Sequence, residues 1–278
     1  MAASAASPLA VIGAGTLAAY WRFQRAVAQA QLAAWLPAGR RVIIDISGPR
    51  SGSAAQAARA GHSVVRVAWG PAGHPGPARF VAGGPAMPLP DGDGRARRGR
   101  PPGTLVTVAA EDGSLGCLAD GCADCVIADD STLSRHLMAE DVTAEIARVL
   151  RPGGSLLASV DSLVLGMAIL AEQHHWAHLT DLPHAEVVLI PWPDGTITRC
   201  FGASQFRDLL TEAGLQPCWI RPRTVLSPST VDHVLQQDPG AIGRLVKAEL
   251  AAGAEEAATE DTDESFGIHL LAAATKPV

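Results

Sequence analysis

Residues 41–52, Arg-Val-Ile-Ile-Asp-Ile-Ser-Gly-Pro-Arg-Ser-Gly, constrain the fold of this chain more than any other stretch. The β-branched residues predict a buried strand that leads into the carboxylate of Asp45 and then into a turn of small residues. The alanine-rich residues 53–60 predict a helix, and Gly61 ends it. A strand, a small-residue turn and a helix in this order place free N–H groups at a helix N-terminus. We therefore expect a ligand at this turn.

The rest of the chain alternates between strand and helix patterns. Further strands are predicted at residues 63–69, 104–110, 123–128, 155–160, 216–221 and 267–274, and further helices at residues 16–35, 141–150, 163–179, 204–213 and 230–252. Pro239 and Gly240 interrupt the last helix, and the tetrad 151–154, Arg-Pro-Gly-Gly, separates helix 141–150 from the strand that follows. This alternation predicts an α/β, Rossmann-like fold with a mainly parallel sheet and helices on both faces.

Two boundaries divide the chain. Residues 1–39 read as an N-terminal helical extension, and residues 40–278 as one α/β domain. Residues 70–103 hold eight prolines and nine glycines among 34 residues, a composition that favours neither a helix nor a central strand. We expect a long, mobile insertion there, a lid or a tolerated loop.

Composition excludes several partners. The formal net charge is −6, and six acidic residues lie between Glu255 and Glu264, so the remainder of the chain is neutral. No broad basic surface for nucleic acid is expected. The apolar residues 8–21 are too few to span a bilayer and follow no basic residue. Together with an odd number of cysteines, five, this favours a cytoplasmic protein in a reducing compartment, without a membrane partner.

Polar or unusual groups stand at the ends of four predicted strands. They are Asp45, Trp69, the pair Glu111 and Asp112, and the pair Asp129 and Asp130. Ligands of parallel α/β sheets bind beyond the carboxyl ends of the strands. These residues are therefore the expected binding site.

Three motifs carry a family resemblance. They are the strand and turn of residues 42–52, the Asp-Gly-x-x-Asp turn and apolar run of residues 120–129 with the following residues 133–137, and residues 145–157, in which a helix ends in Leu-Arg-Pro-Gly-Gly before a strand. Together they resemble the class I S-adenosylmethionine-dependent methyltransferases, of the methyltransferase type 11-like kind, with a degenerate glycine loop.

The resemblance implies a seven-stranded sheet that binds S-adenosylmethionine. The methionine part would lie over the turn that begins at Asp45, and the adenine near Glu111, Asp112, Asp129 and Asp130. The cofactor contacts implied are Asp45, Ser47, Gly48, Gly52, Trp69, Glu111, Asp112, Asp129 and Asp130.

The sequence departs from the family pattern in two places. Ser47 and Pro49 stand where the family has glycines, and Trp69 stands where a carboxylate usually holds the ribose hydroxyls. Losing that ribose contact would weaken binding by ~1.5–3 kcal/mol unless another group replaces it.

Methyl transfer to an oxygen, nitrogen or carbon nucleophile of a small-molecule acceptor is the expected activity, and its catalytic residues are not assigned by the sequence. His136, after the strand 123–128, and His175, in the helix 163–179, are candidates for acceptor contact or proton abstraction. Asp161 stands at a comparable strand end. Structural roles for all three remain open, as do the acceptor and the oligomeric state.

Two other functions fit parts of the sequence. Residues 9–18 contain G-x-G-x-x-A after a short apolar run, a dinucleotide fingerprint that would make the protein an NAD-dependent oxidoreductase using Gly13 and Gly15. Asp45 lies 30 residues beyond Gly15, farther than the fingerprint requires. The altered glycine loop favours a third reading, a non-catalytic methyltransferase-like binding protein.

Metal binding is not expected. Cys117, Cys122 and Cys125 match part of an iron–sulfur spacing but have no nearby fourth thiolate. His174 and His178 share one helix face without a carboxylate that would complete a zinc motif.

Overall fold

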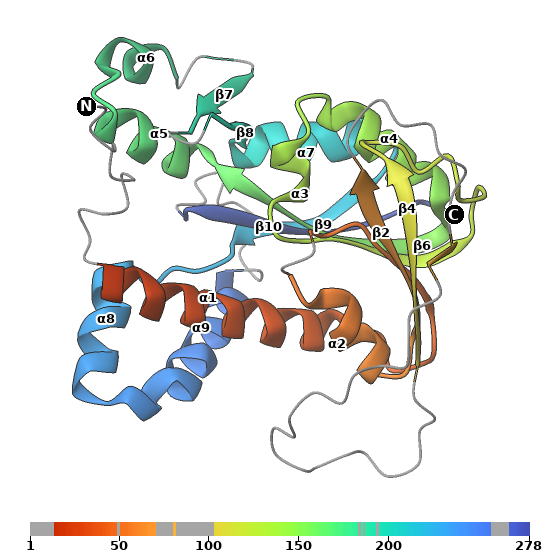
Figure 1. Cartoon of the computed structure of the whole chain (residues 1–278), viewed down its shortest axis with the longest axis horizontal. Coiled ribbons are helices and arrows are strands. Elements are labelled where there is room, and N and C mark those ends of the chain that lie inside the picture. Colours follow the sequence, from red (N-terminus) through yellow and green to blue (C-terminus); the bar gives the residue numbers. More distant parts are fainter. Residues whose placement is uncertain are drawn as a thin grey trace.

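The structure is a computed structural model of the chain (Figure 1). It describes residues 14–48, 51–70, 80–81, 103–182, 185, 187–192, 195–256 and 267–278. Several predictions fall outside the described residues: Gly13, Pro49, most of the predicted insertion 70–103, and the acidic segment after residue 256.

Helices and strands alternate along the described chain. The helices are α1 (Ala14–Trp35), α2 (Ser53–Arg59), α3 (Thr132–Arg135), α4 (Ala139–Val149), α5 (Leu163–Glu172), α6 (Trp176–Asp181), α7 (Ala203–Glu212), α8 (Pro228–Gln237), the 3₁₀ turn η3 (Pro239–Ala241) and α9 (Ile242–Glu256). The strands are β1 (Val42–Asp45), β2 (Ser63–Gly70), β3 (Phe80–Val81), β4 (Thr104–Glu111), β5 (Ala123–Ala128), β6 (Leu150–Ser162), β7 (Val188–Pro191), β8 (Ile197–Phe201), β9 (Gln216–Pro222) and β10 (His269–Thr275).

The strands join in one mixed sheet. Seven of them follow the order β4-β2-β1-β5-β6-β10-β9, in which β10 runs antiparallel to both of its neighbours and the other pairs are parallel. β3 adds to β4, β8 pairs with the end of β6, and β7 pairs with β8. The predicted α/β fold with a mainly parallel sheet is confirmed. Within the described residues the sheet has ten strands rather than the seven expected.

Helices cover both faces of the sheet, as predicted (Figure 1). Successive strand residues point to opposite faces. Ile44 of β1 packs in a core cluster with residues of α4 and α7, whereas its neighbour Ile43 packs with residues of α1 and α2. The β1 strand is therefore buried on both sides, as its continuous apolar run indicated.

Helix α1 packs against the C-terminal helices. Tyr20 and Phe23 are buried in one cluster with Val231 of α8 and Ala241 of η3. The predicted boundary at residue 39 falls between α1 and β1. This packing lays α1 along the sheet, beside the carboxyl ends of β5 and β6 (Figure 1).

The prediction of one continuous helix at residues 163–179 was wrong near the middle of that range. It is broken into α5 and α6, because His174 adopts a left-handed conformation with φ 60°. The N–H of His175 then donates to the carbonyl of Leu170 at 2.9 Å, the ring closure of a Schellman cap. Glycine usually occupies that position, so the histidine concealed the break.

One strand begins earlier than predicted, and two other strands were not predicted. β6 begins at Leu150, so the tetrad 151–154 belongs to the strand, with Gly153 in a left-handed conformation that L side chains rarely adopt. β7 and β8 were not predicted, because the region between residues 179 and 200 shows no clear periodicity. None of the described helices is both long enough and apolar enough to cross a membrane.

Candidate functional site

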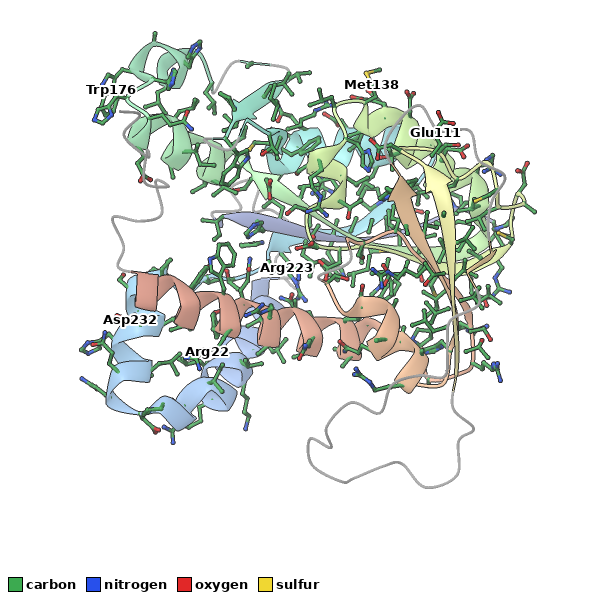
Figure 2. All side chains as sticks on the ribbon, in the orientation of Figure 1. Arg22, Glu111, Met138, Trp176, Arg223 and Asp232 are labelled. Atoms are coloured by element: carbon green, nitrogen blue, oxygen red, sulfur yellow. The ribbon has the colours of Figure 1, made fainter. Side chains whose placement is uncertain are left out.

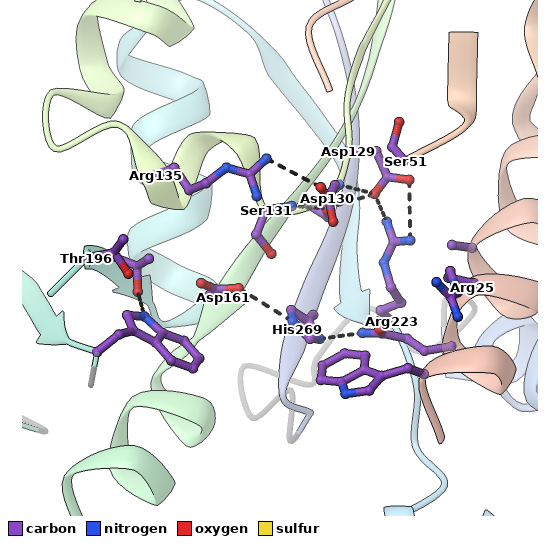
Figure 3. Close-up of a pocket in the computed structure, with 16 residues that line it drawn as sticks. Arg25, Ser51, Asp129, Asp130, Ser131, Arg135, Asp161, Thr196, Arg223 and His269 are labelled. Atoms are coloured by element: carbon purple, nitrogen blue, oxygen red, sulfur yellow. Dashed lines mark hydrogen bonds and ion pairs between the residues drawn. The ribbon is translucent and has the colours of Figure 1, made fainter. Parts of the chain in front are cut away.

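A polar cavity of about 460 Å³ opens at the carboxyl ends of the parallel strands (Figure 3). Its walls come from α1, the ends of β5 and β6, the residues after β9 and the start of β10. Because β10 is antiparallel, its first residue, His269, lies at the same edge as the last residues of β5 and β6. We call this the carboxyl-edge cavity.

Asp45 lies beneath the turn that follows β1. It is 1% exposed, and its two carboxylate oxygens accept hydrogen bonds from the N–H of Ser47 and the hydroxyl of Ser53. Burial raises the pKa of Asp45 to about 6, although those hydrogen bonds oppose the shift. Asp45 thus joins the strand end to the start of α2, and its carboxylate faces the turn's own groups.

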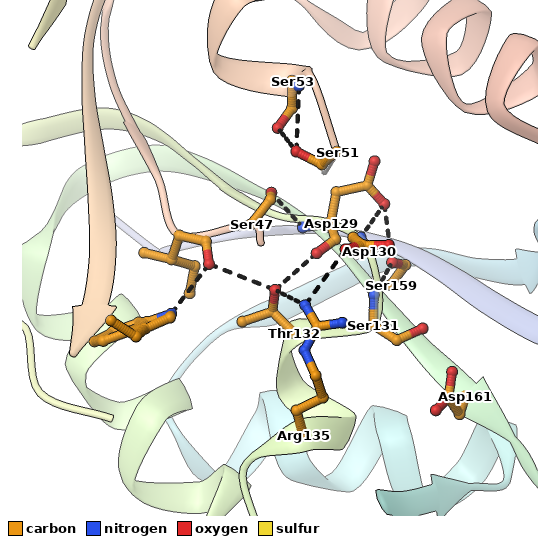
Figure 4. Close-up of polar contacts among 12 residues, drawn as sticks. Ser47, Ser51, Ser53, Asp129, Asp130, Ser131, Thr132, Arg135, Ser159 and Asp161 are labelled. Atoms are coloured by element: carbon orange, nitrogen blue, oxygen red, sulfur yellow. Dashed lines mark hydrogen bonds and ion pairs between the residues drawn. The ribbon is translucent and has the colours of Figure 1, made fainter. Parts of the chain in front are cut away.

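Ser47 links the turn to the next strand. Its hydroxyl accepts a hydrogen bond from the N–H of Asp129 at 2.8 Å (Figure 4). Gly52 has φ 72° and precedes α2, and Ser51 between them lines the carboxyl-edge cavity. Of the described residues of the turn, Ser51 is the one that lines this cavity.

Two charged side chains border Gly48. A Cβ atom at position 48 would lie 2.9 Å from Nη2 of Arg135 and 3.0 Å from Oδ2 of Asp130. Arg135 and Asp130 form an ion pair at 3.5 Å, and both side chains are substantially exposed, at 41% and 39%. They are able to move aside for a ligand at small energetic cost.

Asp129 forms an ion pair with an arginine that lies far from it in the sequence. Arg223, which follows β9, donates to the Asp129 carboxylate in the interior between α1 and the sheet (Figure 2). Burial alone would raise the pKa of Asp129, but Arg223 and the hydrogen bonds from Asp130 N–H and Ser159 hold the pKa below its usual range. Asp129 is consequently a fixed anion whose charge is already paired.

The next two residues are strained. Asp130 and Ser131 have φ angles of 59° and 51°, which cost about 1–2 kcal/mol each for non-glycine residues. The N–H of Asp130 donates to Asp129 at 2.7 Å, and that of Ser131 to Ser159 at 3.2 Å. This sharp bend starts α3 directly after β5, and strain of this kind concentrates at functional sites.

A second group of predicted residues lies on the β2–β4 side of the turn. Trp69 donates from Nε1 to the carbonyl of Ile46 at 3.2 Å, and its ring meets the His136 ring edge-on at 5.4 Å. Asp112 lies 3.6 Å from Nδ1 of His136. Burial lowers the pKa of His136, which favours the neutral ring, and Glu111 is exposed at the surface (Figure 2).

Asp161 and His269 meet at the carboxyl-edge cavity. Oδ1 of Asp161 lies 3.5 Å from Nε2 of His269, and both side chains are about one-tenth exposed. Burial raises the pKa of Asp161 to about 6. Burial also lowers the pKa of His269 to about 3, with a further decrease from Arg223, so the imidazole is neutral at pH 7.

The predicted catalytic histidines lie outside this cavity. His175 lines a separate apolar pocket of about 340 Å³, together with residues of α5, α6 and β7. His136 lies with Trp69 and Asp112, on the other side of the β1 turn. Among the described residues no group of three or more histidine, cysteine or acidic side chains is arranged to hold a metal ion.

Sequence reasoning missed the contributors from the chain ends. Trp21, Gln24 and Arg25 of α1, Arg223 and His269 all line the carboxyl-edge cavity. His269 reaches this edge because β10 runs antiparallel to β6, a direction that the sequence pattern did not indicate. Nothing in the pattern of α1 indicated which helix face would meet the sheet.

Comparison with known proteins agrees with this architecture. A scan against protein-family models finds no match, and a search of curated proteins finds none. Solved structures do match. An S-adenosylmethionine-dependent methyltransferase described as putative, from Listeria monocytogenes, aligns with TM-score 0.54 and 13% identity, over 92% of this chain and 99% of its own.

Two other structures align over similar lengths. A Methanosarcina mazei S-adenosylmethionine-dependent methyltransferase gives TM-score 0.51 at 13% identity, covering 89% of this chain and 97% of its own. The Burkholderia thailandensis 1,6-didemethyltoxoflavin-N1-methyltransferase gives 0.50 at 18%, covering 100% and 94%. The fold is that of the class I S-adenosylmethionine-dependent methyltransferases, which confirms the resemblance that the motifs indicated.

Proposed function

We propose that this protein transfers a methyl group from S-adenosylmethionine to a small molecule bound in the carboxyl-edge cavity. The observation that carries the proposal is the cavity itself. In this fold it opens beside the β1 turn, at the strand ends where such sheets bind ligands. The Burkholderia neighbour was solved with 1,6-didemethyltoxoflavin and S-adenosylhomocysteine, a small acceptor and the spent cofactor.

The residues present fit the cofactor. Gly48 has no side chain where a ligand would approach, and the atoms nearest to a Cβ at this position belong to the side-chain ends of Arg135 and Asp130. The methionine end would lie near Ser51 and the adenine near Asp112, whose side chain is half exposed. The Trp69 ring would contact the ribose in place of the missing acid.

The protein contributes alignment and a dry site. S-adenosylmethionine brings its own activated methyl group, so no protein nucleophile is required. The paired charges of Asp129 and Arg223 form a fixed wall, and Trp21 and Trp192 add apolar surface to the cavity. Holding acceptor and donor in line is the main source of rate enhancement in such a site. We further propose a cytoplasmic location and no nucleic-acid partner, as charge and cysteine content favour.

Titration calorimetry with S-adenosylhomocysteine and with NAD tests this proposal. We expect micromolar binding of the first ligand and none of the second. Asp45→Ala should abolish binding because the turn loses the carboxylate that shapes it, whereas Gly15→Val in α1 should bind normally. Urea denaturation must show that both variants remain folded. Exclusive binding of NAD, or loss of binding in Gly15→Val alone, would contradict the proposal.

One alternative has structural support. Arg135 and Asp130 lie against Gly48, and Trp69 replaces the ribose acid, both of which suit a non-catalytic binding protein. Such a protein would bind S-adenosylhomocysteine without transferring a radiolabelled methyl group from S-adenosylmethionine to any acceptor. Labelled product would exclude this alternative.

A further inference from the structure

Three carboxylates line the carboxyl-edge cavity, and their surroundings differ. Asp129 is paired with Arg223, and Asp130 lies 3.5 Å from Arg135. Asp161 has no arginine or lysine within ion-pair distance among the described residues, and its nearest ring partner is the neutral His269. Asp161 is therefore the carboxylate of this cavity whose charge is least compensated.

His269 is held in one orientation. The amide nitrogen Nε2 of Gln24 lies 2.7 Å from Nδ1 of His269, and an amide nitrogen can only donate. Nδ1 is thus the acceptor, and the ring proton lies on Nε2, which faces Asp161 (Figure 3). The neutral ring N–H thus faces the Asp161 carboxylate at 3.5 Å without cancelling its charge, and the Ser131 side chain is a hydrogen-bond partner of that carboxylate.

The cavity wall favours a planar guest. Two indoles line it, Trp21 from α1 and Trp192 from the segment after β7. Trp21 meets the His269 ring edge-on at 6.3 Å, and Trp192 is fixed by a 2.7 Å hydrogen bond from Nε1 to Thr198. Indole faces stack on aromatic rings, and the volume of about 460 Å³ lies within the range of small-molecule sites.

We propose that Asp161 is a catalytic residue that takes the proton from a planar aromatic hydroxyl acceptor, and that His269 and Gln24 are positioning residues for it. This inference rests on the proposed methyl transfer. The acceptor oxygen forms a bond to the methyl carbon as the carbon–sulfur bond breaks, and the electron pair of that bond stays on sulfur. The hydroxyl proton moves to Asp161 and is later released to water.

Other titratable and charged groups face Asp161. They are Asp130 and Arg135 around α3, Asp129 and Arg223 behind His269, and the buried thiol of Cys200, whose pKa is raised by burial and by Asp161 itself. Burial raises the pKa of Asp161 to about 6, so the carboxylate is ionised and able to accept a proton at neutral pH.

A matched pair of acceptors tests the assignment. 2-Naphthol keeps its proton at mildly alkaline pH and needs a base, whereas 4-nitrophenol is already largely ionised. With S-adenosylmethionine labelled in the methyl group, Asp161→Asn should lower kcat for 2-naphthol by about 10²–10⁴-fold. It should change kcat for 4-nitrophenol less than threefold. The activity of the parent protein on 2-naphthol should decrease as the pH falls below about 6, and this decrease should be absent in Asp161→Asn.

Two further variants keep the test decisive. Asp161→Glu should restore part of the 2-naphthol activity. Gln24→Met, on half-buried α1 surface, should shift the pH below which 2-naphthol activity falls, because the His269 ring loses its amide donor. Equal losses for both acceptors in Asp161→Asn, or no methylation of either acceptor, would overturn the inference. Failure of the parent protein to bind S-adenosylhomocysteine would instead overturn the proposed function.

Discussion

Asp45 ends β1 and Asp129 follows the neighbouring strand β5, yet their surroundings shift the pKa values of the two carboxylates in opposite directions. Asp45 has only neutral donors, Ser47 and Ser53, and burial raises its pKa to about 6. Asp129 is buried as deeply, but Arg223 and its other partners keep its pKa below the usual range. A cation within ion-pair distance decides the direction of the shift at these two positions.

The raised pKa of Asp45 predicts a measurable effect on stability. A carboxyl group whose pKa rises from about 4 unfolded to about 6 folded stabilises the native state at low pH. That contribution is lost as pH rises through about 6. Asp45→Asn removes the titration, and the amide still accepts from Ser47 and donates to Ser53. The variant should therefore gain stability relative to the parent by about 2 kcal/mol between pH 4 and pH 7.

Urea denaturation across that pH range measures this difference. Asp238→Asn is the control, because Asp238 is a surface residue whose pKa is lowered by its hydrogen bond from Arg244. Its stability relative to the parent should not rise with pH over the same range. A flat difference between Asp45→Asn and the parent would show that the Asp45 carboxyl titrates normally.

At the scale of elements, one glycine controls how β4 enters the sheet. Gly103 donates to the carbonyl of Ala58 at 3.1 Å, and a Cβ at this position would lie 2.1 Å from the carbonyl oxygen of His62 and 2.5 Å from that of Ala58. Both contacts are with backbone atoms, which cannot rotate away. Only glycine lets the chain pass α2 and begin β4.

Gly103→Ala should therefore destabilise the protein by about 1–3 kcal/mol, as overpacking does. Gly243→Ala is the matched control. Gly243 lies in α9 with open space where a Cβ would be, so alanine should stabilise the helix by about 0.5–1 kcal/mol. Thermal unfolding of both variants shows whether each substitution lowers or raises the stability of the protein. A stabilising Gly103→Ala would mean that the chain follows another path between α2 and β4.

Most elements were predictable from the sequence, because their patterns are local. Strand β5 was predicted to the residue, and α7 to within one residue at each end. α5 and α6 were merged because a histidine replaced the usual glycine at the break. The pairing of β8 with β6 and the position of α1 depend on contacts between distant segments, which periodicity does not encode.

The lining of the candidate site was also predicted only in part, because local patterns show where strands end but not which distant segments meet there. Asp129 and Asp130 line the carboxyl-edge cavity, as strand ends were expected to do. Trp69 and Asp112 lie together on the other side of the turn, and their cofactor roles remain predictions. Arg223 and His269 could not be assigned, because their place at the cavity follows from the antiparallel insertion of β10.

At the scale of the whole molecule, the packing of α1 on the C-terminal helices supports the cavity. Phe23 is fully buried in that cluster, while Trp21, Gln24 and Arg25 on the same helix line the cavity. Phe23→Ala should cost about 3–5 kcal/mol of unfolding free energy. It should also weaken 2-naphthol binding, because the helix that carries one cavity wall loses its anchor.

Urea denaturation and calorimetry on the same samples measure the two effects. Arg22→Ala is the control, because Arg22 is an exposed residue of the same helix (Figure 2). Arg22→Ala should change neither the free energy of unfolding nor the affinity for 2-naphthol appreciably. Normal 2-naphthol affinity in a destabilised but folded Phe23→Ala protein would show that the wall does not depend on this cluster.

The antiparallel pairing of β10 also determines which contacts can form only after most of the described chain has been synthesised. Gln24 and His269 are joined by a hydrogen bond although 245 positions separate them. As the polypeptide leaves the ribosome, α1 remains without this partner until His269 has been synthesised, and the edge of β6 stays uncovered until β10 emerges. Nascent chains are thus exposed to aggregation during that interval, when chaperones would protect them most.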